Sequence, residues 1–106
     1  MKSVIIIPAR YGSSRYKGKP LAKILNREMV LRVADICSRV VGQKNLYVAT
    51  DDHKIKNVVE NSNYKVIMTS KTCLTGTDRV AEASNKIKAD IYINVQGDEP
   101  TINPSD

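Results

Sequence analysis

A basic loop directly after an apolar run is the stretch of this sequence best suited to chemistry. Residues 4–7 are continuous Val-Ile-Ile-Ile, which is typical of a strand buried on both faces. Residues 10–19 then hold two Gly, two Ser, two Arg and two Lys. Gly lets the backbone approach a ligand, Ser donates hydrogen bonds, and the cations follow the carboxyl end of a strand, where open α/β sheets bind ligands. We therefore expect a polyanion site here, with nucleotide phosphate as the anion.

The positive charge is local to this end of the chain. The formal net charge is +6, yet the first 27 residues carry seven basic side chains and no acidic one, while the remainder sums to −1. A nucleic-acid binder usually spreads Lys and Arg over a face and interleaves aromatic residues, whereas this chain has no Trp or Phe. The loop lacks both the Gly-x-x-x-x-Gly-Lys-[Ser/Thr] and the Gly-x-Gly-x-x-Gly phosphate-binding patterns. A nucleic-acid partner is therefore not expected.

A second candidate site lies at residues 96–100, Gln-Gly-Asp-Glu-Pro, which follow an apolar stretch. Parallel strands share a direction, so a carboxylate just past this strand comes to the same sheet edge as the basic loop. Asp98 is the preferred ligand for Mg2+, because Gly97 frees the backbone to aim it and Mg2+ binds carboxylate and phosphate oxygens together. A solvent-facing turn is the alternative interpretation.

Two further polar segments lie between predicted strands and helices. Residues 75–79, Thr-Gly-Thr-Asp-Arg, offer hydroxyls, backbone N–H groups and Arg79. From these residues alone, a plain helix cap with Arg79 on the surface is slightly favoured over a ligand site. Asp51 and Asp52 are suited to metal binding or to a helix N-terminus, and the helix interpretation is favoured. The single His53 has no partner in sequence that would make it a general base.

The pattern of apolar residues predicts the elements that position these segments. Strands are expected near residues 4–7, 45–50, 64–68 and 90–95. Residues 28–41 are expected to form an amphipathic helix ended by Gly42, with Cys37 in its core face and Met29, Val30, Val33, Ile36, Val40 and Val41 as further members of its apolar repeat.

Two more helices are expected, one capped by Asp51 or Asp52 and one running through Ile87 with Thr77 or Asp78 as its cap. Residues 26–27 are expected to form a turn. Strands that alternate with helices predict an α/β fold with a mostly parallel sheet and helices on both faces.

Five motifs in order resemble a known family. They are Ile-Pro-Ala-Arg-Tyr-Gly-Ser-Ser-Arg (7–15), Gly-Lys-Pro-Leu (18–21), Val-Ala-Thr-Asp (48–51), Gly-Thr-Asp-Arg (76–79) and Asn-Val-Gln-Gly-Asp-Glu-Pro (94–100). As a set they closely resemble the 3-deoxy-manno-octulosonate cytidylyltransferases, also called CMP-Kdo synthetases. The resemblance covers nearly all of this chain, but only about the first two-fifths of a typical member.

The resemblance implies a Rossmann-like nucleotide-diphospho-sugar transferase fold and the reaction CTP + Kdo → CMP-Kdo + pyrophosphate, for lipopolysaccharide synthesis. It implies nucleotide-binding roles by matching position for Ala9, Arg10, Ser13, Ser14, Arg15, Lys19, Thr77, Arg79 and Gln96. Arg10, Arg15 and Lys19 would stabilise the triphosphate during transfer, Arg79 would lie beside the base, and Asp98 would bind Mg2+.

The chain departs from the family pattern at two places. Lys17 stands where the family usually has Pro, and Leu74 and Thr75 replace the usual polar residue and Ser before the Gly-Thr pair. Residues 103–106 also resemble the start of a helix, so residues 1–106 are expected to be the nucleotide-binding part of a longer domain. In the family, the remainder supplies much of the sugar pocket, a second metal-binding Asp and most homodimer contacts.

Two other functions stay open from the sequence: a cytidylyltransferase for another acidic sugar such as a sialic acid, and a non-catalytic nucleotide-binding module. The sialic acid relatives usually carry a Gly-Gly-Ser-Lys-Arg loop, which is not found here. Cys37 and Cys73 lack metal-type spacing, and no signal peptide is visible, so reduced thiols in the cytoplasm are expected. No apolar run approaches the roughly 20 residues that a membrane span needs.

Overall fold

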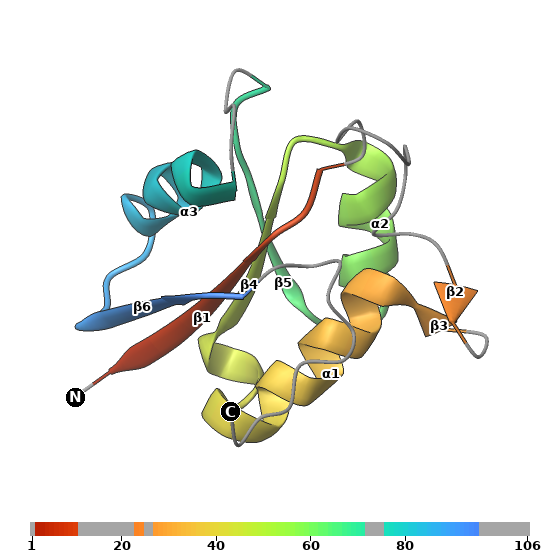
Figure 1. The fold of residues 1–106 in the computed structure, drawn as a ribbon, viewed down its shortest axis with the longest axis horizontal. Helices are drawn as coiled ribbons and strands as arrows, with labels where there is room; N and C mark the ends of the chain where they lie inside the picture. Colours follow the sequence, from red (N-terminus) through yellow and green to blue (C-terminus); the bar gives the residue numbers. More distant parts are fainter. Residues whose placement is uncertain (1, 11–22, 25–26, 72–75, 96–106) are drawn as a thin grey trace.

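The fold is built on a parallel sheet of four strands (Figure 1). The computed structural model describes residues 2–10, 23–24, 27–71 and 76–95. The strands are β1 (Ser3–Pro8), β4 (Leu46–Thr50), β5 (Lys65–Met68) and β6 (Ile91–Asn94), in the order β5-β4-β1-β6. All three neighbouring pairs are parallel. The predicted α/β class is therefore confirmed.

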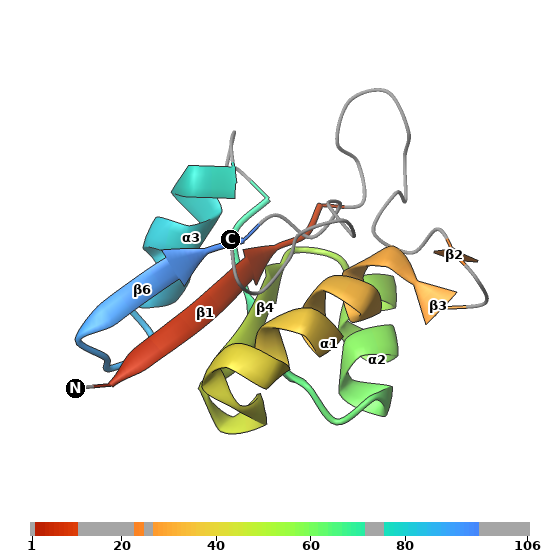
Figure 2. The ribbon, with the colours of Figure 1, turned by 60° about the horizontal axis from the view of Figure 1, so that its bottom comes forward.

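Helices cover both faces of this sheet (Figure 2). They are α1 (Met29–Val41), α2 (His53–Asn61) and α3 (Gly76–Ser84), with a short 3-10 turn η2 (Gln43–Asn45) and a small antiparallel pair, β2 (Lys23–Ile24) with β3 (Arg27–Glu28). Helices α1 and α2 lie on one side of the sheet and α3 on the other. In the described part of the chain, no helix has both the length and the apolar character needed to cross a membrane.

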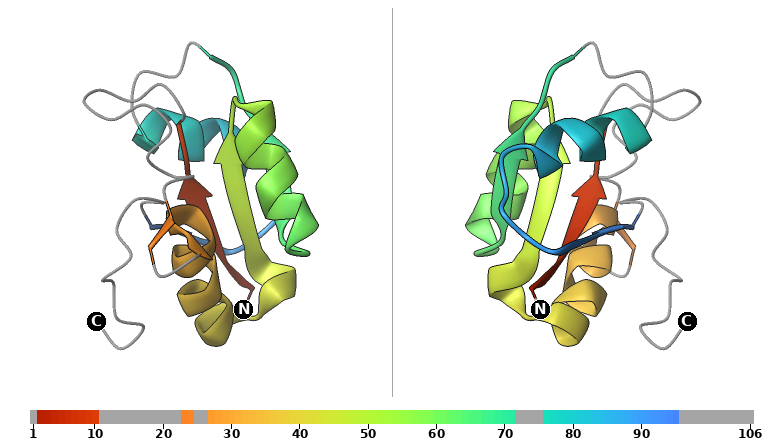
Figure 3. Two further views of the ribbon diagram at one scale, coloured as in Figure 1. Left: turned by 90° about the vertical axis from the view of Figure 1, so that its right-hand side faces the viewer. Right: turned by 90° about the vertical axis from the view of Figure 1, so that its left-hand side faces the viewer.

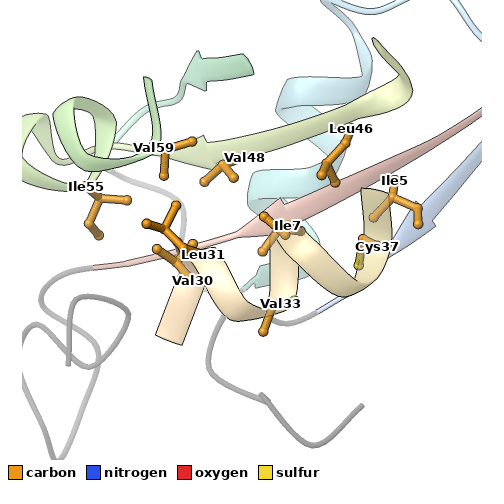
Figure 4. Packing of buried hydrophobic residues seen from close by; sticks show 12 residues of the cluster. Ile5, Ile7, Val30, Leu31, Val33, Cys37, Leu46, Val48, Ile55 and Val59 are labelled. Atoms are coloured by element: carbon orange, nitrogen blue, oxygen red, sulfur yellow. The ribbon is translucent and has the colours of Figure 1, made fainter. Parts of the chain in front are cut away.

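The larger core cluster lies between the sheet and the helices α1 and α2 (Figure 4). Strand residues Ile5, Ile7 and Val48 meet Val33 of α1 and Val59 of α2 there, all at or below 4 % exposure. These apolar side chains repeat every second position in the strands and every three or four positions in α1. Fully burying one such side chain contributes about 1.5–3 kcal/mol.

The smaller core cluster lies on the opposite face and explains the unbroken apolar run of β1. Val4 and Ile6 point there and pack with Ala83 of α3 and with Ile87. Because successive strand residues point to opposite faces, a strand covered by helices on both sides needs apolar residues at every position. The predicted two-sided burial of β1 is confirmed.

Several predicted boundaries need correction. Arg27 belongs to β3 and not to a turn, because it pairs with Ile24. Helix α3 begins at Gly76, so Thr77 and Asp78 lie inside its first turn and neither is its cap; it also ends at Ser84 and does not reach Ile87.

Helix α1 matches its prediction at the end but not over its whole face. Gly42 ends it with φ +82°, a backbone conformation that favours glycine. Cys37 is buried as predicted, whereas Val40 is 53 % exposed and not part of the core face. Only part of the apolar repeat therefore contacts the sheet.

The cap of α2 gives a first prediction. The Asp52 side chain accepts hydrogen bonds from the backbone N–H groups of Lys54 (2.8 Å) and Ile55 (3.0 Å). Replacing Asp52 by Ala should lower the free energy of unfolding by about 1 kcal/mol, because two N-terminal donors lose their acceptor. Urea unfolding followed by circular dichroism measures the change. Asp52→Asn, which keeps an acceptor, is the matched control; equal losses in both variants would contradict the capping role.

The buried thiol of Cys37 gives a second prediction. Burial raises the pKa of Cys37 from 9.0 to about 11. In a Cys73→Ser variant at about pH 8, Cys37 should therefore hold roughly 100-fold less thiolate than an unfolded chain and react with Ellman's reagent correspondingly slowly. Concentrated urea should restore fast labelling, and fast labelling of the folded protein would contradict the burial.

The same shift sets a pH dependence of stability. The folded state keeps the thiol proton to a higher pH than the unfolded chain does. The contribution of Cys37 to the free energy of unfolding is therefore fully present below pH 9 and is lost as the pH rises toward 11.

Candidate nucleotide site at the carboxyl edge of the sheet

The carboxyl ends of the four strands lie at one edge of the sheet. Beyond the strands, the ladder continues for one more residue at three places. The backbone N–H of Ala9 donates to the Ala49 carbonyl (2.9 Å), that of Thr69 to the Thr50 carbonyl (2.9 Å), and that of Val95 to the Ile6 carbonyl (3.2 Å). Figure 3 shows β1 and β4 side by side and running in the same direction toward this edge. The segments that follow the strands are thereby brought together.

Arg79, in the first turn of α3, is the central charged group at this edge. It has no exposed surface, so the interpretation that placed it on the protein surface is wrong. Its Nη1 donates to the Thr69 hydroxyl (2.5 Å) and to the Ser70 carbonyl (3.4 Å). Its Nη2 lies 3.7 Å from Oδ2 of Asp51, which follows β4. A charge removed from water in this way needs such partners, because its desolvation costs several kcal/mol.

Two nitrogens of Arg79 are not hydrogen-bonded. Within the described residues, neither Nε nor Nη2 has a hydrogen-bond partner, although both are buried. A guanidinium carries five N–H donors in a planar fork, and Nε and Nη2 share one edge of it. That edge is suited to a ligand group with two adjacent acceptors.

The segments around Arg79 are held by further hydrogen bonds. The backbone N–H of Ser70 donates to Oε2 of Glu82, one turn after Arg79 on α3 (2.8 Å). The backbone N–H of Asp52 donates to the Thr50 hydroxyl (3.2 Å). The first contact ties the chain after β5 to α3, and the second fixes the turn after β4.

The structure describes four of the predicted site residues. Ala9 is buried and Arg10 is half-buried, both directly after β1. Thr77 is exposed and Arg79 is buried, both in the first turn of α3. The topology brings these two pairs to the same sheet edge. The other predicted residues lie outside the described residues: Ser13, Ser14, Arg15, Lys19, Gln96 and Asp98.

The sequence interpretation missed two residues that contact Arg79, namely Asp51 and Thr69. Asp51 and Asp52 were treated together as cap candidates, but only Asp52 caps α2, while Asp51 pairs with Arg79. One cap needs one carboxylate, so the second Asp was the available signal. Thr69 carried no pattern beyond its place after a strand. Across residues 2–10, 23–24, 27–71 and 76–95, no three His, Cys, Asp or Glu side chains gather as a metal site.

Comparison with known proteins shows that this chain is similar to cytidylyltransferases. A family model described as cytidylyltransferase matches residues 4–106. The chain is 49% identical over 105 residues to a 3-deoxy-manno-octulosonate cytidylyltransferase of Escherichia coli, covering 99% of this chain and 43% of the relative. It is 47% identical over 108 residues to an 8-amino-3,8-dideoxy-manno-octulosonate cytidylyltransferase of Shewanella sp. (strain ANA-3), again covering 99% of this chain and 44% of the relative. The chain thus spans less than half the length of these relatives.

Solved structures show the same relationship. A CMP:2-keto-3-deoxy-manno-octonic acid synthetase complexed with CTP superposes with a TM-score of 0.94 at 48% identity, over 99% of this chain and 44% of that one. A nucleotidyl transferase from Methanothermobacter superposes at 0.79 with 14% identity, over 98% of this chain and 54% of that one, which shows a shared fold. The resemblance found in the sequence motifs is confirmed.

The Arg79 contacts give a third prediction. Thr69→Val keeps the side-chain shape but removes the acceptor of Arg79 Nη1, which leaves a further buried donor without its hydroxyl partner. The free energy of unfolding should fall by about 1–3 kcal/mol. Urea unfolding measures this loss, and Thr69→Ser, which keeps the hydroxyl, is the control. If Val and Ser at this position give equal stability, the hydrogen bond contributes nothing measurable.

Proposed function

The chain belongs to the cytidylyltransferase family, and on that premise we propose that it forms the nucleotide-binding part of an enzyme that transfers CMP from CTP to Kdo. The observation that carries the proposal is the 49% identity, over 99% of this chain, to the E. coli 3-deoxy-manno-octulosonate cytidylyltransferase. The similarity to a synthetase structure complexed with CTP supports the nucleotide. The product, CMP-Kdo, would serve lipopolysaccharide synthesis.

The proposed chemistry is a direct displacement at phosphorus. The anomeric hydroxyl oxygen of the sugar bonds to the α-phosphorus of CTP, the bond from this phosphorus to the β-phosphate oxygen breaks, and the hydroxyl proton is released. No nucleophile from the protein is needed. Catalysis then consists of alignment and of stabilising charge on the phosphates. Basic and hydroxyl side chains near β1 suit both tasks.

We assign the triphosphate to the segment that follows β1. Arg10, Arg15 and Lys19 would hold and neutralise phosphate oxygens, with Ser13 and Ser14 donating hydrogen bonds. The described end of this segment, Ala9 and Arg10, supports the assignment by lying at the carboxyl edge of the sheet.

We assign the nucleoside to the neighbouring segments. Thr77 and Arg79 in the first turn of α3 would lie on the base side, and Gln96, two residues after β6, near the sugar or the nucleotide. The buried polar cluster around Arg79 supports a polar ligand at this place.

Mg2+ is the proposed cofactor, with Asp98 as its ligand. Strand β6 runs parallel to β1, so the chain leaves both strands at the same edge, and Asp98 follows β6 closely in sequence. A carboxylate oxygen is the donor type that Mg2+ prefers. When bound, the ion would neutralise phosphate charge.

The sugar has a second candidate. The Shewanella relative acts on the 8-amino derivative of Kdo and is almost as similar as the E. coli relative. We therefore propose an octulosonate, with Kdo favoured, in preference to a sialic acid. A homodimer and a cytoplasmic location are also proposed: the dimer rests on the family resemblance, and the location is supported by the free thiol of Cys37.

The first test uses the 106-residue chain itself. We expect it to bind CTP weakly by isothermal titration calorimetry in the presence of Mg2+, and to release little or no pyrophosphate with Kdo, because it spans less than half of its relatives. No binding of CTP at any concentration would count against the proposal.

The second test uses a chimera in which residues 1–106 replace the matching region of the E. coli relative. It should release pyrophosphate from CTP only when an octulosonate is present. Asp98→Asn and Lys19→Ala should each lower kcat by about 10²–10³. Lys56→Ala is the control, because Lys56 forms a partly exposed ion pair with Glu60 on α2 (3.1 Å). The E. coli remainder without residues 1–106 is the negative control, and a chimera that releases pyrophosphate no faster than this control would refute the proposed nucleotide-binding role.

A further inference from the structure

The adjacent residues Asp51 and Asp52 serve opposite faces of the sheet. Asp52 caps α2, as described above. Asp51 instead faces Arg79 of α3 across the sheet edge, with Oδ2 3.7 Å from Nη2. Asp51 is only 19 % exposed at its side chain, and Arg79 is fully buried. The ion pair is therefore shielded from water and less weakened by it than a surface pair would be.

Asp51 and Thr69 together define the orientation of the guanidinium. Thr69 holds Nη1, but a contact at one nitrogen leaves the planar group free to pivot about it. Asp51 supplies a second point of attraction at Nη2. With both points fixed, the edge that carries Nε and Nη2 has a defined direction.

That edge is the part of Arg79 without hydrogen-bond partners among the described residues. Nη2 carries two hydrogens, so it can face Asp51 with one and a ligand with the other. A buried donor without a partner costs about 1–3 kcal/mol, so an acceptor brought by a ligand is favoured. Cytosine offers two adjacent acceptors, O2 and N3, whereas N3 of uracil carries a hydrogen.

We propose that Asp51 is a positioning residue: it orients Arg79 so that Nε–H and Nη2–H donate hydrogen bonds to O2 and N3 of cytosine and disfavour uracil. This inference rests on the proposed function. Arg79 is covered in the structure, so the contact requires neighbouring side chains to shift, as is common when ligands bind. Asp51 acts through Arg79 and does not itself contact the nucleotide.

The test compares three ligands on the 106-residue chain: CTP, UTP and inorganic tripolyphosphate. In the unmodified chain, CTP should bind about tenfold or more tightly than UTP, because a donor pair rejects a base that presents a hydrogen. Asp51→Asn should reduce the preference for CTP, so that the affinities for CTP and UTP differ by no more than about twofold. The affinity for tripolyphosphate should stay within about twofold of its original value. Asp51→Glu, which keeps the charge, should restore part of the ratio.

Asp52→Ala is the matched control, because it should lower stability without changing the CTP-to-UTP ratio. A second readout needs no substitution: the Nε–H resonance of Arg79 should shift on adding CTP and not on adding tripolyphosphate. The inference is wrong if the Asp51→Asn and Asp51→Glu variants keep the ratio of CTP affinity to UTP affinity of the unmodified chain. It is also wrong if the Arg79 resonance does not respond to CTP. Failure of the unmodified chain to bind CTP would instead overturn the proposed function and this inference with it.

Discussion

The guanidinium of Arg79 carries a full positive charge with no exposed surface, and the site is arranged around that constraint. Its partners come from the ends of two strands: Thr69 and Ser70 after β5, and Asp51 after β4. Glu82 then ties the chain after β5 back to α3. Because a buried charge that loses a partner is strongly destabilising, the burial of Arg79 depends on these contacts. The first turn of α3 is thereby fixed against the sheet edge where strands β1 and β6 also end.

The sequence predicted the sheet and helices well because each has a strong local signal. The apolar run of β1, the three- and four-residue repeat of α1 and Gly42 at its end all follow from burial and backbone geometry. Local signals were weaker at the ends of α3. Thr77 and Asp78 are both good cap residues, yet the helix begins at Gly76, and Arg79 in its first turn contacts the sheet edge. Such contacts join residues distant in sequence and leave no periodic pattern.

The same reason explains what was missed at the site. The motifs located Arg10 and Arg79 correctly at one sheet edge, because parallel strands share a direction. They did not reveal that Arg79 is buried or that Asp51 faces it. In the sequence, a capping role was a sufficient explanation for both Asp residues before the helix. The two carboxylates have different partners: Asp52 accepts from the first backbone N–H groups of α2, and Asp51 faces Arg79 of α3. Only the three-dimensional arrangement distinguishes the two neighbours.

The two-sided burial of β1 has a consequence for folding. In a strand with one polar face, a slip of one residue exposes apolar side chains and is penalised. The Val-Ile-Ile-Ile run of β1 presents apolar groups to both faces in either alignment, so polarity alone does not select its register. Polar contacts at the ends of the strand supply a further constraint on its register. The backbone N–H of Lys2 binds the Asp90 carboxylate, the N–H groups of Asp90 and Ile91 bind the Lys2 carbonyl, and Ala9 binds Ala49 beyond Pro8. These polar contacts at both ends favour one register for a strand whose side chains are otherwise uniformly apolar.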